Sequence, residues 1–74
     1  LVHPREVFRS AIVCAAASII LIHNHPSGDP APSTEDMEIA ERLIEASKIM
    51  GIEILDFIII GRDAYFSFKR EGFL

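Results

Sequence analysis

The stretch His23-Asn-His-Pro-Ser-Gly-Asp-Pro-Ala-Pro-Ser-Thr-Glu-Asp36 decides how this chain of 74 residues folds. An apolar run, residues 19–22, leads into it, and a short apolar run before turn residues is typical of a buried strand. Successive side chains on a strand point to opposite faces, so His23 and His25 are expected on one face at the strand's end. Two imidazoles on one face can bind a single metal ion, provided that a third ligand approaches them.

Asp36 is the candidate third ligand, because it opens a predicted amphipathic helix. At about 100° per residue, apolar side chains share one arc of this helix and charged ones fill the other. The apolar arc holds Met37, Ile39, Ala40, Leu43, Ile44, Ala46 and Met50. Asp36 falls inside it, and a carboxylate that faces a core is costly unless it is hydrogen-bonded, paired or bound to a metal. We therefore expect Asp36 to meet His23 and His25 at a shared cation.

The same residues also fit a helix cap. Ser33 can be the N-cap, with the acid of Asp36 at the third helical position, where the helix dipole favours a negative charge. A cap alone would explain both residues. The metal interpretation gains weight from the His-x-His pair and from a loop, residues 26–32, that three prolines stiffen. The two roles are compatible, since Ser33 can cap while Asp36 turns toward an ion.

The spacing His23-x-His25-Pro26, six residues, then Ser33-x-x-Asp36 resembles the JAMM signature of the JAB/MPN metalloprotease superfamily. This resemblance implies that His23, His25 and Asp36 ligate Zn²⁺ and that a water fills the fourth position. It also implies that Ser33 stabilises the reacting oxygen. The expected reaction is hydrolysis of a peptide or isopeptide bond, with a peptide or protein as substrate.

Three segments have sequences that resemble the RadC-type branch of that superfamily: residues 23–30, Gly51-Ile-Glu-Ile-Leu-Asp56 and Ile58-Ile-Ile-Gly61. The implied fold is α/β, a mixed β-sheet flanked by helices with cytidine deaminase-like layering. The family also uses as general base a glutamate on a strand before the first helix, and this sequence contains no such strand. We therefore expect residues 1–74 to be the C-terminal part of one such domain and to be inactive alone. RadC-type sequences commonly carry His where this chain has Phe57.

Two alternatives to a hydrolase stay open. One is a non-catalytic JAB/MPN binding module in a RadC protein associated with DNA repair. The other is a metal-dependent nuclease, suggested by the letters His-Asn-His. The formal net charge is −4, and the only basic cluster is Lys69-Arg70, so a nucleic-acid surface is disfavoured. Oligomeric state is not predicted.

Composition sets further limits. Half of the residues are hydrophobic, as in a folded globule, and the length fits one domain. Cys14 is the only cysteine, so no internal disulfide can form and a reducing compartment, the cytoplasm, is expected. No apolar stretch is long enough to cross a membrane.

Other residues offer rival or supporting roles. His3 precedes a helix that begins at Pro4, and we interpret it as flanking that helix rather than as a fourth ligand. Cys14 is expected on that helix's packed side. Asp29 is a rival ligand, although Ser-Gly-Asp-Pro is turn chemistry first. Residues 52–60 predict a central strand covered on both faces, in which Asp56 is structural or orients a ligand histidine.

Overall fold

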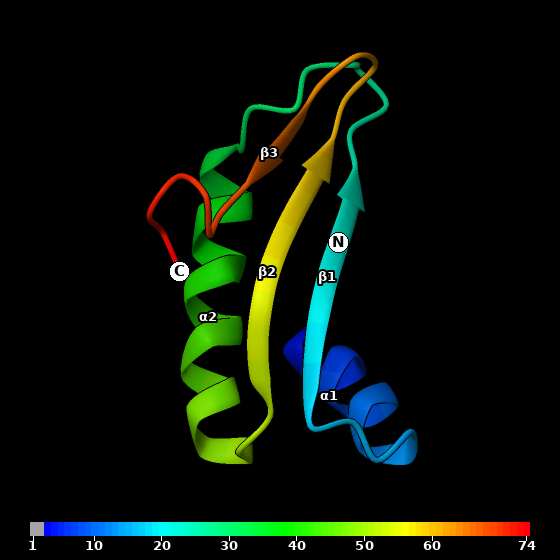
Figure 1. Ribbon diagram of the computed structural model, residues 1–74, viewed down its shortest axis with the longest axis vertical. Coiled ribbons are helices and arrows are strands. Elements are labelled where there is room, and N and C mark those ends of the chain that lie inside the picture. The colour runs from blue at the N-terminus through cyan, green and yellow to red at the C-terminus, as the bar shows by residue number, and fades with distance from the viewer. Residues whose placement is uncertain (1–2) are drawn as a thin grey trace.

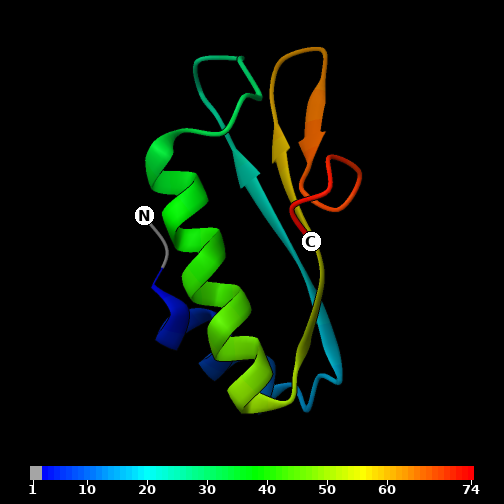
Figure 2. The same ribbon diagram turned by 90° about the vertical axis from the view of Figure 1, so that its left-hand side faces the viewer.

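The computed structural model describes residues 3–74, which form two helices and three strands. In chain order these are α1 (Pro4–Val13), β1 (Ser18–Asn24), α2 (Thr34–Met50), β2 (Glu53–Ile60) and β3 (Tyr65–Ser67). The strands form one mixed sheet in the order β1-β2-β3, with β1 parallel and β3 antiparallel to β2. Both helices lie on the same side of this sheet (Figures 1 and 2). The predicted α/β fold with a mixed sheet is therefore confirmed.

Helix α2 begins and ends where the sequence predicts. The Asp36 N–H donates to Ser33 Oγ at 3.1 Å, and the Ser33 N–H donates to Asp36 Oδ2 at 2.8 Å. This reciprocal pair is a capping box, which satisfies two backbone donors that a helix start would otherwise leave without partners. Gly51 closes the helix in the left-handed conformation, with φ at 69°, which glycine adopts without strain.

The core lies between the helices and one face of the sheet. Its buried members are Phe8, Ala11, Ala40, Leu43, Ile52, Ile54, Phe57, Ile59 and Phe68. Phe57 stacks on Phe68 with ring centroids 4.9 Å apart. The aromatic residue that departs from the RadC-type pattern is thus a packed core residue.

A bulge in β2 sets which side chains face that core. Ile19 pairs with Ile54 but Ile20 pairs with Asp56, so Leu55 has no partner on β1. The extra residue shifts the alternation of the strand. Ile54 and Phe57 consequently both face the helices although they are three residues apart, and Asp56 lies on the opposite face.

The opposite face of the sheet is open in the described part of the chain. Ile20 is 54% exposed, Ile22 66% and Ile60 40%. The expectations that residues 19–22 are buried and that β2 is covered on both faces were therefore wrong. Continuous apolar runs such as residues 19–22 and 52–60 are typical of strands covered on both faces. Within residues 3–74, however, helices cover one face of the sheet alone.

The prediction for Cys14 was also wrong, since this residue is exposed. Helix α1 ends at Val13, and the chain turns away at Ala15, where φ is 53°. The helical periodicity was applied one residue beyond the end of α1, so Cys14 was assigned to the packed face of a helix that had already ended. His3 is the exposed N-cap of α1, as expected of a flanking residue.

Among residues 3–74, neither helix combines the length and the apolar character that crossing a membrane would need.

Candidate metal centre

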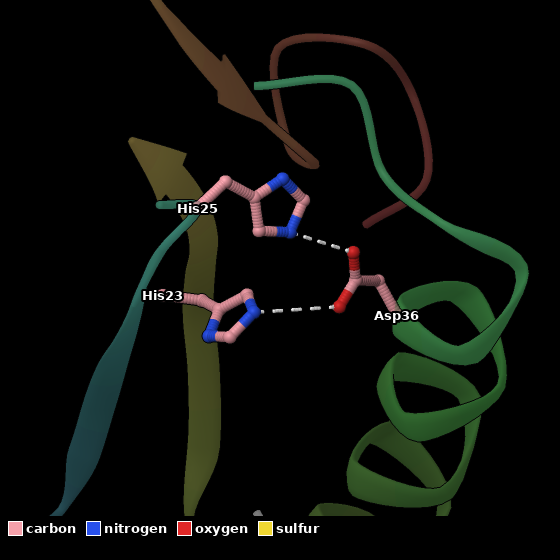
Figure 3. A group of neighbouring side chains, drawn as sticks. All are labelled: His23, His25 and Asp36. Carbon is pink, nitrogen blue, oxygen red and sulfur yellow. Dashed lines mark hydrogen bonds and ion pairs between the residues drawn. The ribbon is translucent and has the colours of Figure 1, made fainter. Parts of the chain in front are cut away.

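His23 and His25 leave the sheet side by side. His23 is in register with Ile59 of β2, and the His25 N–H donates to the Ile60 carbonyl at 3.0 Å, one residue beyond the end of β1. The backbone therefore stays extended through both histidines, and the two rings fall on one face. Their centroids are 4.9 Å apart, and Figure 3 shows both rings directed toward the first turn of α2.

Asp36 supplies the third side chain from that first turn. Its Oδ2 lies 3.0 Å from His25 Nε2, and its Oδ1 lies 3.7 Å from His23 Nε2 (Figure 3). One nitrogen from each histidine and one carboxylate oxygen all lie within 4.8 Å of one another. The structure thus brings together the three residues that the motif selects, and one small cation can reach all three.

The carboxylate of Asp36 is held ionised in a buried place. Only 8% of the residue is exposed. Burial by itself raises the pKa of Asp36, but hydrogen bonds from Ser33 and the charges of His25 and His23 outweigh it, so the pKa lies below its ordinary value. The helix cap therefore does two things: it starts α2 and it presents an anion to the histidines.

The loop after β1 fixes the orientation of the His25 ring. Nδ1 of His25 lies 2.8 Å from the Asp29 carbonyl oxygen, and since a carbonyl only accepts, Nδ1 carries the hydrogen. The Asp29 carboxylate is occupied elsewhere, accepting the Ala31 N–H at 3.0 Å in a turn. Asp29 therefore contributes its backbone oxygen to the site, whereas its side chain has the turn role that the sequence predicts.

With Nδ1 donating its hydrogen to Asp29, Nε2 of His25 needs a proton or a cation to face the carboxylate of Asp36. A neutral imidazole has one N–H, yet both ring nitrogens of His25 face acceptors, the Asp29 carbonyl and Asp36 Oδ2. Either a second proton or a metal ion at Nε2 resolves this. A histidine that donates its distal N–H to a carbonyl while the other nitrogen faces the ion is the usual arrangement of metal-binding histidines.

A cavity of about 220 Å³ opens in front of these groups. It is lined by His23, His25, Ser33, Glu35, Asp36, Ile39 and Phe57. Ser33 therefore lies at the cavity, beside the carboxylate of Asp36. Glu35 is an exposed acid of the charged arc of α2 that also lines the cavity, and sequence reasoning did not name it as a site residue. Its position two residues after the N-cap is the signal that could have found it, since first-turn side chains surround the cap.

Asp56 does not belong to this site. Its carboxylate accepts the Ser67 hydroxyl at 2.6 Å, the Phe57 N–H at 2.7 Å and the Lys69 N–H at 3.1 Å. Burial raises the pKa of Asp56, and these donors together with the Lys69 charge outweigh it and lower the pKa. Of its two predicted roles the structural one is confirmed, because none of these partners is a candidate ligand.

Comparison with known sequences adds independent information. The sequence model of the RadC-like JAB domain matches residues 1–73. The chain is 65% identical over all its residues to a UPF0758 protein of Syntrophomonas wolfei, 64% to one of Trichlorobacter lovleyi and 58% to one of Methanococcoides burtonii. It covers 32% of the length of each of these relatives.

Proposed function

This chain belongs to the RadC-like JAB domain family, and from that premise we propose that His23, His25 and Asp36 hold a Zn²⁺ ion for hydrolysis of peptide or isopeptide bonds. The single observation that carries the proposal is the meeting of three ligand atoms within 4.8 Å at the wall of a cavity. The substrate proposed is a peptide or protein. A net charge of −4 disfavours nucleic acid.

The donor set fits zinc in a catalytic rather than a closed structural site. Two imidazole nitrogens and one carboxylate oxygen leave one tetrahedral position open for water or substrate, as in hydrolytic zinc enzymes. The second carboxylate oxygen of Asp36 already accepts the Ser33 N–H, which leaves Oδ1 as the oxygen available to an ion. A bound Zn²⁺ would polarise a carbonyl and lower the pKa of bound water to about 7.

The chain's own residues would position these parts. The Asp29 carbonyl holds the His25 ring, and Ser33 holds the Asp36 carboxylate, so neither ligand has to be ordered when the ion arrives. The Ser33 hydroxyl accepts the Asp36 N–H and keeps its own hydrogen for donation into the cavity. Such a donor aimed at a developing oxyanion is worth about 3 kcal/mol.

We also propose that residues 1–74 are the C-terminal part of the domain and that a longer chain supplies the general base. Two observations support this. This chain covers 32% of the length of the relative from Syntrophomonas wolfei, which is therefore about three times as long as the matching segment. The open face of the sheet exposes large apolar side chains, Ile20, Ile22 and Ile60, that a longer chain can cover.

A non-catalytic binding module is the second candidate, and one observation favours it. Asp36 Oδ2 already has two partners, Ser33 N and His25 Nε2, so the fold is complete without an ion. In that case the chain would bind no zinc, or would bind it without any hydrolysis by the longer protein.

The test measures zinc by mass spectrometry and by titration in the native chain that contains these residues. We expect one zinc per wild-type chain and at least about 100-fold weaker binding by His25→Ala and Asp36→Asn, since losing a ligand costs more than losing its outer support. Glu38→Gln, an exposed acid of the same helix, is the matched control and should bind as the wild type does. Equal zinc content and affinity in all four proteins would show that His25 and Asp36 are not zinc ligands.

A further inference from the structure

The loop of residues 26–32 is hydrogen-bonded to the turn between β2 and β3, and Gly61 of that turn lies directly against Gly28 and Pro30 of the loop. We propose that Gly61 is a positioning residue for the metal centre: the absence of its side chain lets the loop come near enough for the Asp29 carbonyl to hold the His25 ring. This inference rests on the proposed function, because its main consequence is the affinity for zinc.

The approach leaves no room for a Cβ atom at Gly61. An ideal Cβ there would lie 2.4 Å from the Gly28 carbonyl oxygen, 2.7 Å from Pro30 Cδ and 2.9 Å from Pro30 N. Two of these three atoms are backbone, so no side-chain rotation relieves the contacts. The positive-φ glycines of the described chain are Gly28, Gly51 and Gly72. Gly61 is not among them, so this position requires glycine for space rather than for conformation.

The Pro30 atoms that crowd Gly61 are covalently linked to the Asp29 carbonyl, which holds the His25 ring. Pro30 N belongs to the same peptide unit as the Asp29 carbonyl, and a peptide unit moves as a plane. That carbonyl oxygen is the partner of His25 Nδ1 at 2.8 Å. Any displacement of Pro30 away from Gly61 therefore moves the oxygen that fixes the tautomer and the direction of His25.

Backbone hydrogen bonds tie the loop and the turn to His25, so neither segment can move to make room for a Cβ at Gly61 without affecting that residue. The Arg62 N–H donates to the Gly28 carbonyl at 2.9 Å, and the Gly28 N–H donates to the His25 carbonyl at 3.0 Å. On the other side the His25 N–H donates to the Ile60 carbonyl at 3.0 Å. If the loop moves, the Asp29 oxygen moves. If the turn moves instead, it pulls on Ile60 and thus on His25 itself.

The experiment compares Gly61→Ala with the wild type by zinc titration in the native chain. We expect affinity to fall by about 10- to 100-fold, the usual cost of disturbing the outer support of a metal ligand. Gly51→Ala is the matched control, because it strains the end of α2 at a φ of 69° with no atom within 4 Å of the added Cβ. It should lower stability and leave zinc affinity unchanged.

A second measurement follows the His25 ring alone. The proton resonance of Nδ1–H, protected by the Asp29 carbonyl, should be present in the wild type and in Gly51→Ala and lost in Gly61→Ala. Wild-type affinity and an unchanged resonance in Gly61→Ala would overturn the inference while leaving the proposed function intact. If the wild type binds no zinc, the proposed function fails, and the resonance still decides whether Gly61 sets the ring.

Pro30→Ala is the variant to use if Gly61→Ala does not fold. It keeps Gly61 and removes the Cδ atom that fills the space beside the Gly61 Cα, where a Cβ would lie, so the loop is looser but not displaced. The expected loss of zinc affinity is in the same direction and smaller, about 2- to 10-fold. Unchanged affinity in Pro30→Ala would contradict the role of this contact.

Discussion

Two carboxylates on opposite faces of the sheet, Asp36 and Asp56, solve the same physical problem differently. Asp36 is buried and Asp56 is partly buried, and each has a pKa below its ordinary value because nearby donors outweigh the effect of burial. Asp56 has three donors from the protein, Ser67, Phe57 and Lys69, which complete both oxygens. The protein completes only one oxygen of Asp36.

The difference between them lies in what remains to be bound. Asp36 Oδ2 has two partners, whereas Oδ1 faces His23 Nε2 across 3.7 Å, too far for a hydrogen bond. A carboxylate whose two oxygens are both completed by neutral donors supports the fold. Asp36 instead places one oxygen against each of two imidazoles and leaves Oδ1 without a hydrogen bond, which suits it to a cation. Removal from water alone therefore does not distinguish the structural acid, Asp56, from the candidate metal ligand, Asp36, but the set of partners does.

The largest expected effect is stabilisation by zinc. At about 100 times Kd, zinc should raise the free energy of unfolding of the wild type by about 2.7 kcal/mol. Asp36→Asn should gain almost nothing, because it lacks a ligand, while Asp56→Asn should gain the full increment. Chemical unfolding with and without zinc measures all three. A full increment in Asp36→Asn would erase the contrast between the two acids.

Next in size is the structural cost of losing Asp56. Asp56→Ala leaves three donors without their acceptor, and such unpaired groups cost about 1–3 kcal/mol in the free energy of unfolding. Zinc affinity should not change. Asp63→Ala, an exposed acid of the β2–β3 turn, is the control and should unfold like the wild type. Weakened zinc binding in Asp56→Ala would show that the two faces are coupled.

The smallest effect is the dependence of metal-free stability on pH. A carboxyl whose pKa is lowered on folding contributes stability above its unfolded value, 3.8, and loses it as pH falls through the lower folded value. The free energy of unfolding should therefore fall as the solution is acidified below 3.8. Asp56→Asn should show a shallower acid limb, and an identical limb would mean that Asp56 titrates alike in both states.

Much of the candidate site is encoded locally and could be predicted. His23 and His25 follow from strand alternation, and the inward direction of Asp36 follows from helix periodicity. Ser33 follows from capping chemistry. Their meeting requires only that the strand end and the helix start lie together, which a short proline-rich loop enforces.

What could not be predicted depends on backbone atoms and on distant segments. The Asp29 carbonyl holds His25, and every residue has a carbonyl, so no residue type marks this one. The need for Gly61 arises from a loop about thirty positions earlier in the chain. The bulge at Leu55 and the open sheet face were also missed, because the apolar run of residues 52–60 shows no alternation from which to infer either.

The capping box has a consequence for how related sequences should be interpreted. Ser33 and Asp36 begin α2 whether or not a metal is bound, so a related chain that binds no metal still uses them to start this helix. His23 and His25 do not cap a helix, so we expect substitutions at these two positions to be tolerated first. Loss of the His-x-His pair, rather than of Ser-x-x-Asp, is therefore the earlier sign that a related chain no longer has the three side chains of the proposed metal centre.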